Sequence, residues 1–87
     1  MSAYVYILKD ERGKFYIGST PDVEKRLKQH LAGYTQTTRN MKNPELVLKQ
    51  EVPTFLIARK IEARLKRLKR KDYIEKIVAD GYIKVAE

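Results

Sequence analysis

Two aromatic and β-branched runs, separated by a short turn sequence, constrain the N-terminal part of the chain most strongly. The runs are AYVYIL at 3–8 and FYIG at 15–18, and DERG stands between them at 10–13. Such runs favour strands, and a short glycine-containing loop favours an antiparallel connection. We therefore predict a β-hairpin, with the even-numbered side chains of the first strand on one face and the odd-numbered ones on the other.

The segment after the hairpin predicts a helix. Thr20 supplies a hydroxyl N-cap and Pro21 suits the first helical position. Apolar residues then recur every four positions until Gly33 ends the helix. The predicted buried stripe consists of Val23, Leu27 and Leu31. A polar loop at 34–44 follows.

A third strand at 45–52 and two further helices complete the chain. The longer helix opens at Pro53-Thr54 and runs to about residue 69, and the shorter one runs from about 72 to 80. The predicted buried stripe of the longer helix is Ala58, Ile61, Leu65 and Leu68. The element order is ββαβαα. We predict a single α+β domain over 1–87, with a small three-stranded antiparallel sheet flanked by helices.

Composition excludes several classes of protein. The chain has no cysteine, so it has neither a disulfide framework nor a thiolate metal site. We expect no secretory leader, because the first residues lack a basic segment and a small-residue cleavage site, and no apolar run reaches the roughly 18 residues that a membrane span needs. We expect a cytoplasmic protein. The net charge of +8 on 87 residues favours a nucleic-acid partner, with an anionic membrane surface as the weaker alternative.

Glu62 is the least ordinary residue of the longer helix. It stands beside the apolar stripe, whereas the segment 59–71 otherwise contains eight basic residues and no second acid before Asp72. A carboxylate near the core needs a partner, which could be a divalent cation or a neighbouring basic side chain. The basic residues would bind phosphates with little sequence discrimination. They include Arg59, Arg64, Lys66, Arg67, Lys69 and Arg70, and loop residues Arg39 and Lys42 could add contacts or simply be solvated.

Four more residues carry side chains suited to phosphate chemistry. Tyr6 and Tyr16 lie in the two hairpin strands, and their phenols would emerge together if the two residues were paired directly. Arg26 and His30 are four apart on the first predicted helix, so they share one side of it. Arginine binds phosphate through two hydrogen bonds, and histidine transfers protons at neutral pH. Each residue alone also has an ordinary structural interpretation.

The order and spacing of these residues resemble the GIY-YIG nuclease family, which includes the N-terminal cleavage domain of the excinuclease. Tyr4-Val5-Tyr6 corresponds to the first motif, with tyrosine in place of the family's glycine. Tyr16-Ile17-Gly18 gives the second motif in full, ten residues later. Arg26, His30 and Glu62 follow in the family's order. Two departures are Ser19, where some members have lysine, and the lack of an asparagine after Glu62.

The resemblance implies an endonuclease that hydrolyses DNA backbones, structure-selective rather than sequence-selective, with a place in DNA repair. It implies that Glu62 binds one Mg²⁺ or Mn²⁺ ion and that Arg26 neutralises the charge that develops on the phosphoryl group. Tyr6 would position the attacking water or the phosphate, and Tyr16 or His30 would be the general base. Gly18, which has no side chain, would let backbone or phosphate approach closely. DNA is the expected partner, with RNA as an alternative, and a partner protein could supply specificity. The rival interpretation is a non-catalytic nucleic-acid-binding module that keeps the fold.

Overall fold

The computed structural model describes residues 2–31, 43–68 and 70–83, with the backbone alone for 30 and 31. Six elements follow in the predicted order: β1 (Ala3–Lys9), β2 (Phe15–Thr20), α1 (Val23–Leu31), β3 (Glu45–Val52), α3 (Phe55–Leu68) and α4 (Lys71–Asp80). The strands form one antiparallel sheet in the order β2-β1-β3. The predicted α+β class and element order are therefore confirmed. No helix in the described part of the chain is long and apolar enough to cross a membrane.

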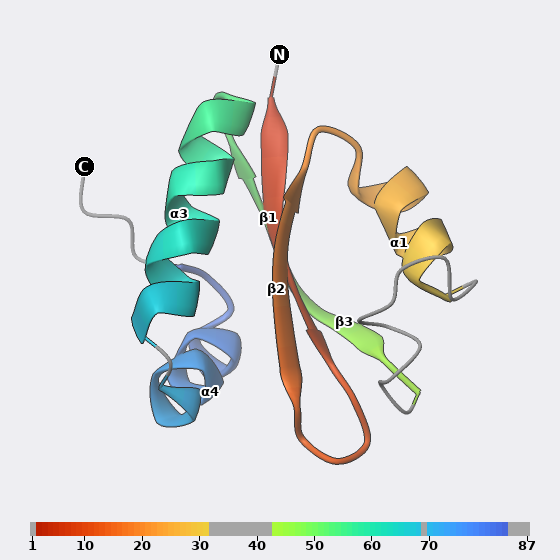
Figure 1. Cartoon of the computed structure of the whole chain (residues 1–87), viewed down its shortest axis with the longest axis vertical. Coiled ribbons are helices and arrows are strands. Elements are labelled where there is room, and N and C mark those ends of the chain that lie inside the picture. Colours follow the sequence, from red (N-terminus) through yellow and green to blue (C-terminus); the bar gives the residue numbers. More distant parts are fainter. Residues whose placement is uncertain (1, 32–42, 69, 84–87) are drawn as a thin grey trace.

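The sheet has β1 at its centre and β2 at one edge (Figure 1). The pairing of β1 with β3 contains one irregularity, because Ile7 lies opposite Leu48 whereas Leu8 lies opposite Leu46. Val47 is thus an extra residue in β3, as in a β-bulge. No feature of the sequence indicated this position.

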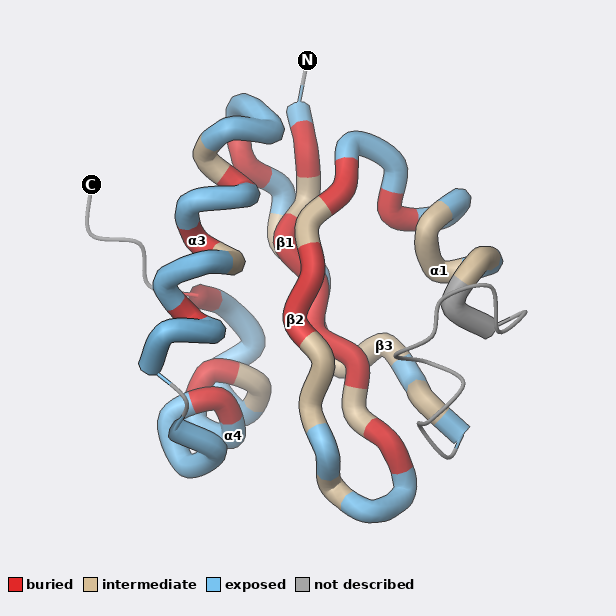
Figure 2. The backbone as a smooth tube through the Cα atoms, viewed as in Figure 1, coloured by how far each residue is buried: buried red, intermediate tan, exposed pale blue. Residues whose placement is uncertain are grey.

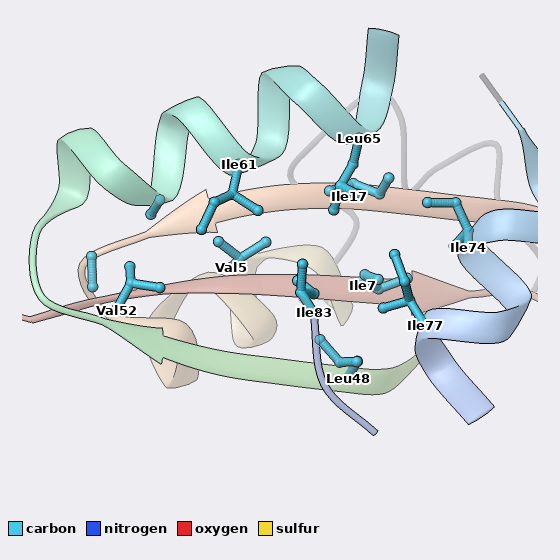
Figure 3. Packing of buried hydrophobic residues seen from close by; sticks show 12 residues of the cluster. Val5, Ile7, Ile17, Leu48, Val52, Ile61, Leu65, Ile74, Ile77 and Ile83 are labelled. Carbon is cyan, nitrogen blue, oxygen red and sulfur yellow. The ribbon is translucent and has the colours of Figure 1, made fainter. Parts of the chain in front are cut away.

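Helices cover both faces of the sheet, with α3 and α4 on one side and α1 on the other (Figure 1). The alternation predicted for β1 accounts for this division. The odd-numbered Val5 and Ile7 belong to the larger hydrophobic cluster, to which α3 and α4 contribute (Figure 3). The even-numbered Tyr6 and Leu8 belong to a second, smaller cluster with Val23 of α1. In Figure 2, buried positions alternate with exposed ones along α3, as expected for a helix that packs on one side.

The N-cap of α1 differs from the predicted one. Thr20 is buried, and its hydroxyl accepts a hydrogen bond from the backbone N–H of Asp22 at 3.1 Å. Asp22 Oδ1 in turn accepts the N–H of Lys25 at 3.1 Å, which makes Asp22 the N-cap. The prediction that Thr20 caps the helix was wrong, because the hydroxyl is used inside the turn before it. In α3, Thr54 caps the helix as expected, accepting the N–H of Ile57 at 3.2 Å.

The core also departs from prediction at two positions. Leu68 was predicted to be buried, but it is 43% exposed at the end of α3. Ile83, which was not predicted, is only 5% exposed and packs in the larger cluster (Figure 3). Its N–H donates to Gln50 Oε1 at 2.6 Å, and Gln50 Nε2 donates to its carbonyl at 3.1 Å. These two bonds attach the chain after α4 to β3. The side chain of Leu31 lies outside the described residues.

Candidate active site

Tyr6 and Tyr16 lie on the α1 face of the sheet, but they are not paired directly. The register places Tyr6 opposite Gly18 and Leu8 opposite Tyr16. The direct pairing that the sequence left open is therefore not the register of the hairpin. The two tyrosines are diagonal neighbours, with ring centroids 6.3 Å apart and ring planes inclined at 42°. Diagonal neighbours on one face of a sheet are still close enough for aromatic rings to touch, so the two rings come together.

Gly18 accommodates the ring of Tyr6. A Cβ at position 18 would lie 2.3 Å from Tyr6 Oη and 2.4 Å from Tyr6 Cζ, which is closer than atoms can approach. Gly18 is buried beneath this ring. In the structure, the group that approaches the backbone of Gly18 is the phenol of Tyr6.

Arg26 extends from α1 to both tyrosines. Its guanidinium hydrogen-bonds the phenols of Tyr6 and Tyr16, and the bond with Tyr6 is the main cause that raises the pKa of Arg26 above its usual range. It also donates to Gln29 Oε1 at 3.2 Å. Burial raises the pKa of Tyr6 to about 12, although the hydrogen bond from Arg26 acts in the opposite direction. At neutral pH the Tyr6 phenol therefore keeps its proton, and Arg26 stays charged.

Glu62 approaches the same strand from α3, on the other face of the sheet. Ser19 Oγ donates a hydrogen bond to Glu62 Oε1, and Lys66 Nζ donates to Glu62 Oε2 at 2.7 Å. The Glu62 side chain is 22% exposed and the Lys66 side chain is 50% exposed. Of the two partners considered for Glu62, the structure contains the basic neighbour, four residues later on the same helix.

The two groups of side chains meet at the outer edge of β2. Alternation along β2 directs Tyr16 to the α1 face and Ser19 to the α3 face. Because β2 is an edge strand, no further strand separates the two sides there (Figure 1). Lys66 Nζ lies 5.7 Å from the centroid of the Tyr16 ring, and the charge of Glu62 contributes to the raised pKa of Tyr6. We call this group the edge site; it consists of Tyr6, Tyr16, Ser19, Arg26, Glu62 and Lys66.

A groove of about 330 Å³ adjoins the edge site. Tyr16 and Lys66 belong to its lining as well as to the edge site. The remaining lining combines buried apolar side chains with exposed cations, and includes Ile17, Leu65, Ile74, Arg70 and Lys71. The groove therefore offers apolar contact and positive charge beside the tyrosine.

The basic residues of α3 do not form a single surface. With 3.6 residues per turn, Arg59 and Lys66 lie on the same side of the helix as Glu62, whereas Arg64 and Arg67 lie toward the opposite side. All four are exposed. Only part of the predicted basic surface thus adjoins the edge site.

Some of these cations have partners within the protein. Lys66 is paired with Glu62, and the guanidinium of Arg59 lies 5.9 Å from the centroid of the Phe55 ring. Arg70 is paired with Asp72 at 2.9 Å. Arg39, Lys42, Lys69 and the side chain of His30 lie outside the described residues.

Two oxygen-bearing side chains, Glu62 and Ser19, lie together here, and oxygen is the ligand atom that hard divalent cations prefer. Within the ranges that the structure describes, no group of three or more His, Asp or Glu side chains could hold a metal ion. A site at Glu62 would therefore have few protein carboxylates, and Mg²⁺ commonly binds through one or two of them, with water and phosphate completing its shell. The Lys66 ammonium shows that this carboxylate already attracts a cation, and the Ser19 hydroxyl adds a second hard oxygen beside it.

Sequence reasoning did not assign Ser19 and Lys66 to this site. Ser19 was noted only as a substitution for lysine, and Lys66 only as a phosphate-binding residue. The spacing of Glu62 and Lys66, four apart on a helix, is a recognised ion-pair spacing and could have indicated their contact. The contact of Ser19 depends on the packing of α3 against β2, which no local pattern reveals.

Comparisons with known proteins identify the family of this chain and agree with its fold. The GIY-YIG catalytic domain matches residues 2–76. A UPF0213 protein of Halalkalibacterium halodurans is 36% identical over 72 residues, which cover 82% of this chain and 77% of that protein. The UPF0213 protein YhbQ of Escherichia coli strain K12 is 32% identical over 79 residues, or 90% and 78% of the two chains. The solution NMR structure of a UPF0213 protein from Bacillus halodurans is similar, with a TM-score of 0.59, 33% identity, and coverage of 93% of this chain and 87% of that one. This chain therefore belongs to the GIY-YIG family of nuclease catalytic domains.

Proposed function

We propose that this protein is a divalent-metal-dependent endonuclease that hydrolyses DNA phosphodiester bonds and selects nucleic-acid structure rather than sequence. The observation that supports the proposal is the edge site itself. Two phenols, a guanidinium and a carboxylate, from four separate elements, meet at one strand edge. Core packing does not require such polar groups to converge, whereas phosphate hydrolysis uses each of them.

Arg26 supplies positive charge at the reacting phosphate. Its bonds to Tyr6 and Tyr16 hold the guanidinium in one orientation. A guanidinium held in this way can stabilise negative charge that develops on the phosphoryl oxygens, without reorganising during the reaction. Arg26 is therefore both a phosphate-binding and a catalytic residue in this proposal.

The general base is Tyr16 or His30, and not Tyr6. With a pKa of about 12, the Tyr6 phenol holds its proton too tightly to remove one from water at neutral pH. It can instead donate a hydrogen bond and position the attacking water or the phosphate. Tyr16 lies beside two cations, Lys66 and Arg26, and it faces the groove at the edge of β2.

Glu62 is the proposed metal ligand, for one Mg²⁺ or Mn²⁺ ion. When bound there, the ion would supply Lewis-acid stabilisation of the phosphate and of the leaving oxygen. Ser19 fixes one oxygen of the carboxylate, so Glu62 stays oriented toward the edge site whatever occupies its other oxygen. The exposed cations beside the site, Arg59 and Lys66, would bind flanking phosphates of DNA or RNA.

One observation favours a different function. Both oxygens of Glu62 are already bonded within the protein, to Ser19 and to Lys66. An ion pair of this kind is also what a non-catalytic nucleic-acid-binding module with the same fold would contain. The two functions differ in one measurable respect, which is turnover in the presence of a divalent ion.

The deciding experiment compares cleavage by the parent protein and Glu62→Gln. Labelled duplex, nicked, branched and single-stranded DNA, and matching RNA, are incubated with Mg²⁺, Mn²⁺ or EDTA. We expect parent cleavage that EDTA abolishes, and no cleavage by Glu62→Gln, because an amide is a much poorer ligand for these ions. Nucleic-acid binding should be unchanged or slightly tighter.

Glu75→Gln is the matched control, since it makes the same change at an exposed position of α4. It should cleave like the parent, and melting temperatures should be measured for all variants. Parent-level cleavage by Glu62→Gln would show that the assigned ligand is wrong. Metal-independent binding without any cleavage by the parent would favour the binding module.

A further inference from the structure

The contact between Lys66 and Glu62 places a cation of the protein on the carboxylate assigned to the metal. We propose that the Lys66 ammonium is the resident counter-ion of Glu62, and that a divalent ion binds there only by exchange with it, while the released ammonium takes a nucleic-acid phosphate as its new partner. This inference rests on the proposed metal-binding role of Glu62. It adds that Lys66 couples metal binding to nucleic-acid binding.

The geometry makes exchange necessary. Lys66 Nζ lies 2.7 Å from Glu62 Oε2, which is full hydrogen-bonding distance for an ammonium and a carboxylate. Glu62 Oε1 is taken by Ser19 Oγ. A divalent ion bound to Glu62 would therefore lie within a few ångströms of the ammonium, and two cations at that separation repel each other strongly. The ammonium must leave before the ion can bind.

The geometry also makes exchange possible. Half of the Lys66 side chain is exposed, so its flexible stem can turn away without disturbing the core. Ser19 belongs to β2 and not to α3, and it holds the carboxylate independently of Lys66. Glu62 can thus lose the ammonium and keep its orientation.

The surroundings of Lys66 explain why a nucleic-acid phosphate would favour release of the ammonium from Glu62. Lys66 shares the adjoining groove with two exposed cations, Lys71 and Arg70, of which Arg70 is paired with Asp72. An ammonium that leaves Glu62 therefore moves among other positive charges. A nucleic-acid phosphate in this region would offset that charge, so metal and nucleic acid should each increase the affinity of the other, as linkage requires.

The first test measures Mn²⁺ binding to the full chain without nucleic acid, by the electron paramagnetic resonance signal of free Mn²⁺. An i,i+4 ion pair of partly exposed residues shifts an equilibrium by about two- to fivefold. We expect Lys66→Met to bind Mn²⁺ tighter by about that factor, and Lys66→Arg, which keeps the charge, to remain near the parent. Glu62→Gln provides the baseline for binding elsewhere on the protein.

Lys60→Met is the matched control. It removes the same charge from the same helix, but the helical period places residue 60 on the side away from Glu62. Its effect on Mn²⁺ affinity should be clearly smaller than that of Lys66→Met. Equal effects of the two substitutions would mean that Lys66 affects Mn²⁺ affinity only through the net charge of the protein. That result would overturn the inference.

The second test uses the unaltered protein and follows the ¹⁵N resonance of the Lys66 ammonium during a Mg²⁺ titration. Release from Glu62 should shift this resonance as Mg²⁺ saturates, and Glu62→Gln should abolish the Mg²⁺-dependent shift. A Lys66 signal that stays constant while Mg²⁺ binds Glu62 would overturn the inference. If both tests succeed and no nucleic acid is cleaved, the exchange stands and the proposed nuclease function fails.

Discussion

The ring of Tyr6 lies directly on the backbone of Gly18, its partner across the β1–β2 pair. A Cβ added at residue 18 would be 2.3 Å from Tyr6 Oη and 2.9 Å from Tyr6 Cε1. The phenol of Tyr6 also contacts Arg26, whose hydrogen bond and positive charge both lower the pKa of Tyr6. The glycine of the second family motif thus determines the position of the tyrosine of the first.

Gly18→Ala should destabilise the protein and displace Tyr6. Overpacking of this kind costs about 1–3 kcal/mol, and removing the ring in a Gly18→Ala/Tyr6→Ala double variant should recover part of the loss. Gly81→Ala is the matched control, because residue 81 has φ +80 but open space around it, so only backbone strain of about 1 kcal/mol applies. Urea unfolding of these three variants and of the single variant Tyr6→Ala measures both effects. Additive losses at positions 6 and 18 would contradict the contact.

Stability in alkaline solution should depend on Tyr6. Its pKa of about 12 in the folded state exceeds the ordinary value of about 10, so the folded protein holds this proton more tightly than the unfolded chain does. The resulting contribution, up to about 3 kcal/mol, is complete below pH 10 and is lost as the pH rises from 10 to 12. Tyr6→Phe should remove this dependence.

Urea unfolding at several pH values between 9 and 12 provides the measurement. Tyr73→Phe, at an exposed position of α4, controls for the loss of a hydroxyl. The free energies of unfolding of the parent and of Tyr6→Phe should converge as the pH rises through this window. A constant difference between them would contradict the prediction.

The parts of the fold that follow from local patterns were predictable. The DERG turn is an example: Asp10 Oδ1 accepts the N–H groups of Arg12 and Lys14, and Gly13 has φ +83. These are the interactions for which aspartate and glycine are common in turns. The strand alternation likewise predicted that the even-numbered and odd-numbered side chains of β1 lie on opposite faces, where they join different clusters.

The parts that depend on strand register and sheet order were not predictable. Whether Tyr6 faces Gly18 or Tyr16 depends on a shift of two residues, and the sequence of the hairpin allows both. That β2 is an edge strand, so that Glu62 meets Tyr16 around it, depends on β3 pairing with β1 instead. Ile83 shows the same limit, since its backbone is hydrogen-bonded to Gln50, 33 residues earlier in the chain, and its side chain packs in the larger cluster.

Arg26 should be sensitive even to a substitution that keeps its charge. Lysine at residue 26 cannot hydrogen-bond two phenols and a phosphate as the planar guanidinium can. We expect Arg26→Lys to bind nucleic acid almost as well as the parent but to cleave about 10²-fold more slowly, as when one transition-state donor is lost. Arg26→Ala should weaken both binding and cleavage.

Single-turnover rates and binding isotherms separate the two effects. Lys28→Ala, at an exposed position of the same helix, is the control for a change of charge on α1. It should affect binding slightly and the single-turnover rate not at all. Cleavage by Arg26→Lys at the parent rate would show that the contribution of Arg26 to cleavage comes from its charge alone and not from its bonds to the tyrosines.

The salt dependence of binding should distinguish the two sides of α3. Each phosphate contact contributes about −0.9 to the slope of log K against log salt on duplex DNA, and about −0.7 on single strands. Arg59 lies on the side of Glu62 and is exposed, so Arg59→Ala should make the slope less negative by about 0.7–0.9. Arg64→Ala removes the same charge from the opposite side of the same helix, and its slope should stay near that of the parent. The binding isotherms of both variants should be measured on the same oligonucleotide, in proteins that also carry Glu62→Gln, so that cleavage does not interfere. Equal changes for Arg59→Ala and Arg64→Ala would mean that nucleic acid contacts both sides of α3, and that its path is not set by the edge site.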